Sequence, residues 1–345
     1  MKTKKIYLEI LRIIACFLVI ARHTNSFVLH TSSTNSFSWI ITVCYHMLSM
    51  VCVPIFFMIS GSLFLSKERT YKEMIKKTIM RLLIPMLFFS IIIHFKRIPI
   101  LSIENILNFI DLFLKNQILG TYWFIYALMG LYLATPFLQK ICKNMTEKDY
   151  RIFMLYALIF VMIVPIFKRY DIFVLASEFN IPLMSSYIIY YIIGNYIFNY
   201  DIKTNKKQDT YIIILSIIVL VLGTVMTYVD CNILNLNDYY YVDMNRITVY
   251  IPSIMIAYLM RKKIEKINIS EQKEAKILSI SATTFGVYLV HALFIDNCKF
   301  IYTFMTNTLS IWPFLSLIIY QIILFAFLVL IIKILKKIPG IQKVV

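Results

Sequence analysis

Charged side chains are scarce in this sequence: Asp, Glu, Lys and Arg make up 15% of its 345 residues, against about 25% in an ordinary soluble domain. Glycine and proline are scarce too, with 7 and 9 residues, which argues against a disordered or loop-rich chain. The six cysteines include no C-x-x-C pair, so neither a disulfide framework nor a zinc site is indicated. What remains is an apolar chain, and 60% of its residues are hydrophobic.

The apolar residues are gathered in ten blocks of roughly 17–25 residues, the length of helix that crosses a ~30 Å hydrocarbon core. We therefore predict an all-α integral membrane protein of about ten transmembrane helices, in a single membrane-embedded domain over residues 1–345. The shorter stretch 102–115 is amphipathic, which favours a short helix lying at the membrane interface. The predicted spans are 7–29, 39–65, 79–96, 121–139, 152–168, 183–200, 210–229, 245–261, 279–297 and 312–335.

Positive charge dominates, with 35 Lys and Arg against 18 Asp and Glu and a net charge of +17. If the N-terminus is cytoplasmic, 26 of the basic residues fall in segments predicted to face the cytoplasm and 6 in segments predicted to lie outside. This asymmetry predicts that both termini are cytoplasmic, and it explains the net charge without a nucleic-acid partner. The first block follows Lys2, Lys4 and Lys5; we expect it to be retained as a helix, because it is long and no cleavage pattern follows it.

Ionisable residues inside a span are costly, so those of the first block are functional candidates. Arg12 and His23 are eleven residues apart, and a helix therefore places them on one face with ~16 Å of rise between them. Glu9 is spaced to pair with Arg12. One helix face thus offers a cation towards the cytoplasm and an imidazole towards the outer side.

The ninth block places Tyr288 and His291 on one helix face. His291 lies at a depth comparable with that of His23, so two histidines from different helices are placed to converge. Histidine is the usual general base near neutral pH, but a helix-packing hydrogen bond is the alternative explanation. His46 and the remaining histidines follow no metal-ligand spacing, and we expect no metal.

Two features of the second and fourth blocks have a packing explanation beside a functional one. Ser60 and Gly61 permit a close approach between helices. Trp123, near the start of the fourth block, suits the membrane interface, and stacking on a substrate is the alternative.

Two loops carry charge that a substrate would recognise. The basic run at 67–81 suits the phosphates of a nucleotide-like donor, or equally the positive-inside rule and anionic lipid; it includes Lys76, Lys77 and Arg81. The outer loop at 230–244 holds three Asp, the tyrosines at 239–241 and no Lys or Arg. Such side chains bind sugar hydroxyls and ring faces, whereas the alternative is an interfacial aromatic belt beside an ordinary loop.

Together these pieces resemble the acyltransferase-3 family of bacterial membrane O-acyltransferases. The resemblance covers nearly the whole chain and rests on four motifs in the family's order: Leu8-Glu9-Ile10-Leu11-Arg12 through His23; Phe56-Phe57-Met58-Ile59-Ser60-Gly61; Tyr122-Trp123-Phe124 through Gly130-Leu131-Tyr132-Leu133 and Pro136; and Ser281 through Tyr288-Leu289-Val290-His291.

The resemblance implies ten core helices and transfer of an acyl group, usually acetyl, from cytoplasmic acyl-CoA to a carbohydrate hydroxyl. It implies that His23 is the catalytic base and that Arg12 is essential for donor binding or site geometry. Some members carry an additional esterase-like domain, which we do not expect here. Arg22 is a departure, because that position is more often apolar; it either faces lipid headgroups or acts on His23.

We therefore expect a multi-pass protein of the cytoplasmic membrane that O-acetylates a surface polysaccharide or its lipid-linked precursor, with polysaccharide-assembly proteins as further partners. Acyl-CoA would be the co-substrate, and the expected residues are grouped by role. Catalysis is assigned to His23, Arg12, Glu9, His291 and Tyr288, donor binding to Arg12, Lys76, Lys77 and Arg81, and acceptor binding to Trp123 and Ser60. The alternative is a transporter or flippase of a lipid-linked sugar, although we find no internal repeat of the kind that transporters often show.

Overall fold

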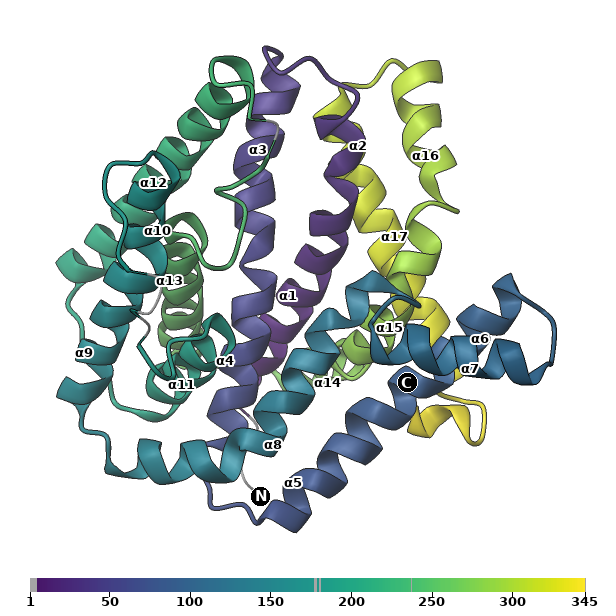
Figure 1. The fold of residues 1–345 in the computed structure, drawn as a ribbon, viewed down its shortest axis with the longest axis horizontal. Helices are drawn as coiled ribbons and strands as arrows, with labels where there is room; N and C mark the ends of the chain where they lie inside the picture. Colours follow the sequence, from purple (N-terminus) through teal and green to yellow (C-terminus); the bar gives the residue numbers. More distant parts are fainter. Residues whose placement is uncertain (1–4, 177–178, 180, 237, 345) are drawn as a thin grey trace.

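The computed structural model describes residues 5–176, 179, 181–236 and 238–344. In that part of the chain the regular structure is helical throughout (Figure 1). Lys2 and Lys4, which we counted among the predicted cytoplasmic charges, lie outside the described residues. The prediction of an all-α membrane protein is confirmed.

The first five predicted blocks are all helical. Short turns of 3₁₀ or π geometry, labelled η, join or interrupt the α-helices. The elements are α1 (Ile6–Thr24), α2 (Ser26–Leu29), α3 (Phe37–Met50), α4 (Cys52–Phe64), α5 (Tyr71–Thr78), η1 (Ile79–Leu83), α6 (Ile84–Arg97), α7 (Ile103–Leu114), η2 (Gly120–Tyr122), α8 (Trp123–Asn144), α9 (Glu147–Tyr156), η3 (Ala157–Ile163) and α10 (Val164–Arg169).

The last five predicted blocks are helical as well. Their elements are α11 (Ser186–Asn199), α12 (Lys206–Asn232), α13 (Ile247–Ile264), α14 (Glu271–Ser281), α15 (Thr284–Ile295), α16 (Lys299–Thr303), η4 (Phe304–Thr308), α17 (Pro313–Leu335) and η5 (Ile341–Lys343).

By length and apolar composition, six helical segments of the described residues are able to cross a membrane, or seven if the bent pair α14 and α15 is one broken span. The predicted count of about ten is therefore not confirmed. The remaining blocks depart from a regular span for different reasons. Helix α11 has 14 residues, whereas α1 carries Glu9, Arg12 and Arg22, and α13 ends in Arg261, Lys262 and Lys263.

Local signals set where several helices begin. Helices α5, α9 and α12 each start with a capping box, in which a side-chain oxygen of the capping residue accepts from a backbone N–H three residues on and a second side chain returns the bond. The boxes pair Thr70 with Glu73 and Asn205 with Gln208. All three follow loops that we predict to be cytoplasmic.

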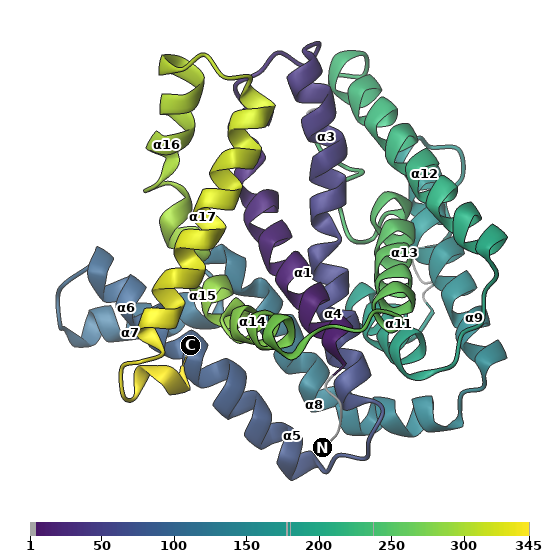
Figure 2. The same ribbon diagram turned by 180° about the vertical axis from the view of Figure 1, so that it is seen from behind.

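Helix α1 lies at the centre of the molecule (Figure 1). It contacts α3, α4, α13, α14, α15 and α17, so elements from both ends of the chain surround it. From behind, α17 runs beside α15 on one side of α1, while α12 and α13 lie on the other (Figure 2). This position presents the ionisable residues of α1 to several other helices at once.

Helices α4 and α11 cross with their backbones in contact. A Cβ atom added to Gly61 would lie 1.8 Å from the carbonyl oxygen of Tyr191, and one added to Gly194 would lie 2.0 Å from that of Met58. No side chain fits at either position, so both must be glycine for the helices to pack this closely. The packing interpretation of the Ser60-Gly61 pair is therefore confirmed for Gly61.

The amphipathic stretch at 102–115 forms α7, as predicted. The Ser102 hydroxyl caps the helix by accepting from the backbone N–H of Asn105, and Phe109 faces inward. Several large apolar side chains on the other face are exposed, among them Leu107 and Leu114. That pattern fits a helix whose apolar face meets lipid, and its location at the interface remains a prediction.

Candidate active site

A cavity of about 170 Å³ lies beside the C-terminal part of α1. Its walls come from α1, the junction of α3 and α4, the start of α8, and α15. All four motifs of the family resemblance therefore contribute to it. The residues that line it are Val19, Arg22, His23, Met50, Cys52, Val53, Phe56, Thr121, Trp123, Phe124 and Tyr288. The lining combines an imidazole, a guanidinium and a hydroxyl with several aromatic rings.

His23 lies in the cavity wall with its ring 5.2 Å, centroid to centroid, from the ring of His291. The convergence of these two histidines, expected from their depths, is therefore present. Within the described part of the chain the His23 side chain makes no hydrogen bond, and it retains partial exposure. Its nitrogens are thus available to a molecule in the cavity.

His291 lies behind His23 and is fully buried. Its Nδ1 is 2.6 Å from the backbone oxygen of Tyr288, whereas its Nε2 is buried without a partner among the described residues. Since a carbonyl oxygen only accepts, Nδ1 carries the proton and Nε2 keeps a lone pair. Neutral His291 therefore accepts a proton or hydrogen bond at Nε2, and it has no N–H there to offer an oxyanion.

Tyr288 and Thr121 connect α15 to the start of α8. The Tyr288 hydroxyl donates to the backbone oxygen of Thr121, and the neighbouring Tyr122 hydroxyl donates to that of Leu289 at 2.9 Å. Thr121 is one of the cavity-lining residues, and its hydroxyl is buried without a partner in the described chain. Of the two hydroxyls, that of Thr121 rather than that of Tyr288 is thus the one left without an acceptor.

Trp123 also lines the cavity, with its ring 6.1 Å from that of Tyr187. Phe124 continues the aromatic wall, 5.5 Å from the ring of Tyr288. This arrangement adds a flat aromatic surface to the lining that also contains the polar groups of α1. Such a surface is suited to a sugar ring, which has one apolar face and an edge of hydroxyls.

Arg22 points into the same cavity and pairs with His46 on α3: its Nη1 is 2.7 Å from His46 Nε2. Because arginine only donates, Nε2 accepts and Nδ1 carries the proton. The side-chain amide nitrogen of Asn25 lies 3.1 Å from Nδ1. Of the two positions open to Arg22, the structure gives the one beside His23 rather than a lipid headgroup position.

The opposite end of α1 holds Glu9 and Arg12. Their side chains form an ion pair at 2.6 Å, and the Ser281 hydroxyl from α14 donates to the Glu9 carboxylate. Arg12 remains about a quarter exposed, with 27% of its side chain accessible. Glu9 therefore orients a guanidinium that is still open to a ligand, ~16 Å of helix rise from His23.

The predicted donor-binding residues do not all gather at Arg12. The Tyr132 hydroxyl interacts with Ser60, and both Arg81 and Arg12 act on it electrostatically. Lys77 instead lies over the ring of Phe64 at 5.0 Å. Lys76 is exposed on α5. Ser60 thus belongs to the Arg12 end and does not line the cavity with Trp123.

A family model described as an acyltransferase domain matches residues 5–336, nearly the whole chain. This chain belongs to the acyltransferase-3 family. No curated protein and no solved structure matches it. Family and fold together establish a multi-pass membrane acyltransferase.

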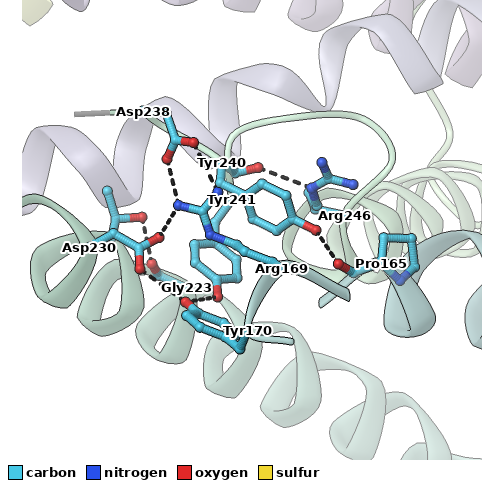
Figure 3. Close-up of polar contacts among 10 residues, drawn as sticks. Pro165, Arg169, Tyr170, Gly223, Asp230, Asp238, Tyr240, Tyr241 and Arg246 are labelled. Carbon is cyan, nitrogen blue, oxygen red and sulfur yellow. Dashed lines mark hydrogen bonds and ion pairs between the residues drawn. The ribbon is translucent and has the colours of Figure 1, made fainter. Parts of the chain in front are cut away.

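The outer loop of this acyltransferase uses its acidic residues internally. Arg169 at the end of α10 pairs with Asp230 at 2.8 Å and with Asp238 at 2.7 Å (Figure 3). The hydrogen bonds from Arg169 hold the pKa of Asp238 below its usual value. Both carboxylates therefore pair with Arg169, and a sugar contact for Asp238 stays a prediction.

The tyrosines of that loop are engaged as well. The Tyr240 ring lies between two guanidinium groups, 4.2 Å from Arg169 and 3.7 Å from Arg246, and the Tyr241 hydroxyl is 2.7 Å from that of Tyr170 (Figure 3). We refer to Arg169, Tyr170, Asp230, Asp238, Tyr240, Tyr241 and Arg246 as the outer clamp. It fixes the loop between α12 and α13 to the end of α10.

Two groups in or next to the acyltransferase cavity were not assigned a role from the sequence. Thr121 gives no signal, because a threonine at a helix start is usually a cap and only the fold shows that its hydroxyl is unpaired. His46 was noticed but had no partner pattern. The departure at Arg22 was the available signal, since a charge inside a span calls for a polar neighbour on another helix.

Proposed function

We propose that this acyltransferase moves an acyl group, in the first instance acetyl, from cytoplasmic acyl-CoA to a hydroxyl of a surface polysaccharide or its lipid-linked precursor in the cytoplasmic membrane. The observation that carries the proposal is the cavity that His23 and Trp123 both line, with the ring of His291 and its buried, unpartnered Nε2 next to the ring of His23. A base, a free hydroxyl donor and an aromatic wall are what transfer to a sugar hydroxyl requires.

The donor enters at the end of α1 that carries Arg12. Guanidinium groups bind phosphate oxygens in a bidentate manner, and Arg81 on η1 acts electrostatically on the same Tyr132 hydroxyl as Arg12. Glu9 fixes the direction of Arg12 through their ion pair. The extended pantetheine arm of CoA then spans the ~16 Å of helix rise to His23 and delivers the thioester to the cavity.

The acyl transfer proceeds in two steps. His23 removes the proton of the acceptor hydroxyl as its oxygen attacks the thioester carbon, which forms a C–O bond and a tetrahedral oxyanion. That intermediate collapses, the C–S bond breaks, and the departing sulfur takes the proton from the His23 imidazolium to leave as the CoA thiol. The lone pair of His291 Nε2 stabilises the imidazolium in between.

Thr121 supplies the donor for the oxyanion. Its hydroxyl is the buried, unpartnered O–H group of the cavity lining, whereas the Tyr288 hydroxyl already donates to a backbone oxygen. An oriented donor at a developing negative charge is worth about 10²–10³ in rate. Tyr288 is then a positioning residue that holds the Thr121 backbone against α15.

The test uses membranes that contain the full-length protein, radiolabelled acetyl-CoA and a mixed pool of surface glycans. Label should enter glycan with wild type and should fall by about 10²–10⁴ with His23→Ala, the range that a general base contributes. His30→Ala is the matched control, since His30 is an exposed histidine just beyond α2 and outside the cavity. A His23→Ala protein that is folded and transfers label at the wild-type rate would refute the mechanism.

The same assay separates the enzyme from the transporter alternative. Only an acyltransferase consumes the thioester, so release of free CoA thiol that depends on added glycan supports the proposal. Glycan movement across vesicles without thiol release would favour the transporter. Repeating the measurement with succinyl-CoA identifies the acyl group.

A further inference from the structure

Arg22 brings a positive charge into the catalytic cavity. Its guanidinium lines the same space as His23 and Trp123, and one corner is held by the 2.7 Å contact between Nη1 and His46 Nε2. The remaining guanidinium N–H groups have no hydrogen-bond partner within the described part of the chain. They are oriented donors that the protein itself leaves unused.

The charge of Arg22 is not neutralised by an ion pair. None of the ion pairs formed among the described residues includes it. His46 is neutral, because its Nε2 must accept from Arg22. Asp243 acts on Arg22 electrostatically across space but forms no ion pair with it.

Such an arrangement is costly for a protein that only needs a stable fold. A cation removed from water without an adjacent anion loses solvation that no contact restores. The His46 side chain is itself held by Asn25, which in turn bonds to Ser49 at 3.3 Å and to Gln321 at 3.2 Å. This network fixes one edge of the guanidinium and leaves the other edge directed at the cavity.

We infer that Arg22 binds an oxyanion, a carboxylate or phosphate, carried by a substrate close to the atoms that react at His23. The inference rests on the proposed function and narrows its substrate class: either the glycan acceptor is anionic at or near the acylated sugar, or the acyl group is a dicarboxylic one. A planar fork binds both kinds of oxyanion by two parallel charge-assisted hydrogen bonds. Trp123 across the cavity contributes the apolar face for the sugar ring.

The experiment uses isothermal titration calorimetry to measure equilibrium binding to the full-length protein in detergent. Such a measurement needs no turnover. The acceptor probes are methyl glucuronide, glucose 1-phosphate and the neutral methyl glucoside, and the donor probes are succinyl-CoA and acetyl-CoA. We expect one anionic probe to bind about 10- to 100-fold more tightly than its neutral counterpart, the worth of charged hydrogen bonds. The probe that shows the preference identifies the source of the oxyanion.

Three variants accompany the wild type. Arg22→Gln should bind the anionic probe no better than the neutral one, and Arg22→Lys, which keeps the charge but loses the fork, should fall between. Arg151→Gln is the control, because Arg151 is an exposed arginine whose side chain is 67% accessible and pairs with Glu147; it should keep the preference. Lysine at position 22 also provides a folded comparison if the glutamine variant is unstable.

Two results overturn the inference: an undiminished preference in Arg22→Gln, or a wild type that prefers no anionic probe over its neutral counterpart. These results are distinct from failure of the proposed function. If an anionic probe binds through Arg22 but wild type transfers no label, only the acyl transfer is refuted. If label enters neutral glycan equally with wild type and Arg22→Gln, only the oxyanion site is refuted.

Discussion

The loop between α12 and α13 contacts Arg169 directly and Arg22 through His46, and the two arginines differ in whether a carboxylate neutralises their charge. Asp238 of this loop pairs with Arg169, whose side chain is 10% exposed and which also binds the fully buried Asp230. Tyr239 of the same loop lies 6.0 Å, ring to ring, from His46, which holds Arg22. Arg169 thus has two carboxylates and the ring of Tyr240, whereas Arg22 has a neutral imidazole.

This difference separates a structural role from a functional one. In the outer clamp, Arg169 lies between the carboxylates of Asp230 and Asp238 and forms an ion pair with each, as the stability of a partly buried cluster requires. At the cavity, Arg22, Thr121 and the neighbouring His291 each retain polar groups without partners among the described residues. Unpaired groups that converge on one space are best explained by a ligand that supplies the missing partners.

The largest effect is expected from breaking the clamp. Arg169→Ala leaves the Asp230 carboxylate, 0% exposed, buried without its cation, and should lower the free energy of unfolding by about 3–5 kcal/mol. Thermal unfolding in detergent measures this. Acyl transfer per folded molecule should change far less than stability. An Arg169→Ala protein as stable as wild type would mean that the clamp is not structural.

Replacing Thr121 should produce the reverse pattern. Thr121→Val removes a hydroxyl that has no partner among the described residues, so stability should be unchanged or slightly raised. The rate of acyl transfer should fall by about 10²–10³ if this hydroxyl stabilises the oxyanion. The comparison is made by measuring melting temperature and rate on the same preparation.

Thr135→Val is the matched control for Thr121→Val. The Thr135 hydroxyl donates to the backbone oxygen of Leu131 and lies 2.8 Å from the hydroxyl of Tyr191, both buried. Its loss should therefore cost about 1–3 kcal/mol in stability and leave the rate per folded molecule intact. If both threonine variants lose stability equally, the cavity hydroxyl is paired after all.

Arg22→Gln should change the stability of the protein much less than Arg169→Ala does. Because the guanidinium forms no ion pair in the described chain, its removal relieves a desolvated charge while losing one hydrogen bond to His46. The two contributions oppose, so the melting point should shift by an amount equivalent to less than about 1 kcal/mol. Destabilisation as large as that of Arg169→Ala would assign Arg22 to the fold.

The helices and the approach of His23 to His291 were predictable because they depend on local periodicity. Ten apolar blocks give ten helical regions, and depth along a span follows from residue number and rise alone. The number of spans was less predictable. Charges in α1 and α13 and the bend between α14 and α15 make these segments irregular as membrane spans. The average apolar content of a block does not show such local features.

Ion pairs and hydrogen bonds between residues far apart in the sequence were not predictable. Arg169 finds Asp230 and Asp238 across separations of 61 and 69 residues, and the sequence alone suggested a sugar contact for Asp238. Likewise the 24 residues between Arg22 and His46 include a turn whose geometry no local pattern specifies. Both cases show that an ionisable side chain can be recognised as important before its partner, and hence its role, is known.

Within the outer clamp, Asp238 should contribute least to stability, and its contribution should depend on pH. Its pKa is held below the usual value, first by the hydrogen bonds from Arg169, so its contribution to stability is complete above the ordinary pKa of about 3.9 and is lost as pH falls through the lower folded value. The side chain is 56% exposed, and after solvent screening we expect Asp238→Asn to cost less than about 1 kcal/mol at pH 7. Melting curves of wild type and variant should differ slightly at pH 7 and converge as pH falls through the lowered folded pKa, where wild-type Asp238 becomes protonated. A difference that persists in acid would show that the Asp238 carboxylate acts through its shape and not its charge. In that case Asp230, which is fully buried against the same arginine, would alone supply the electrostatic stabilisation of the outer clamp.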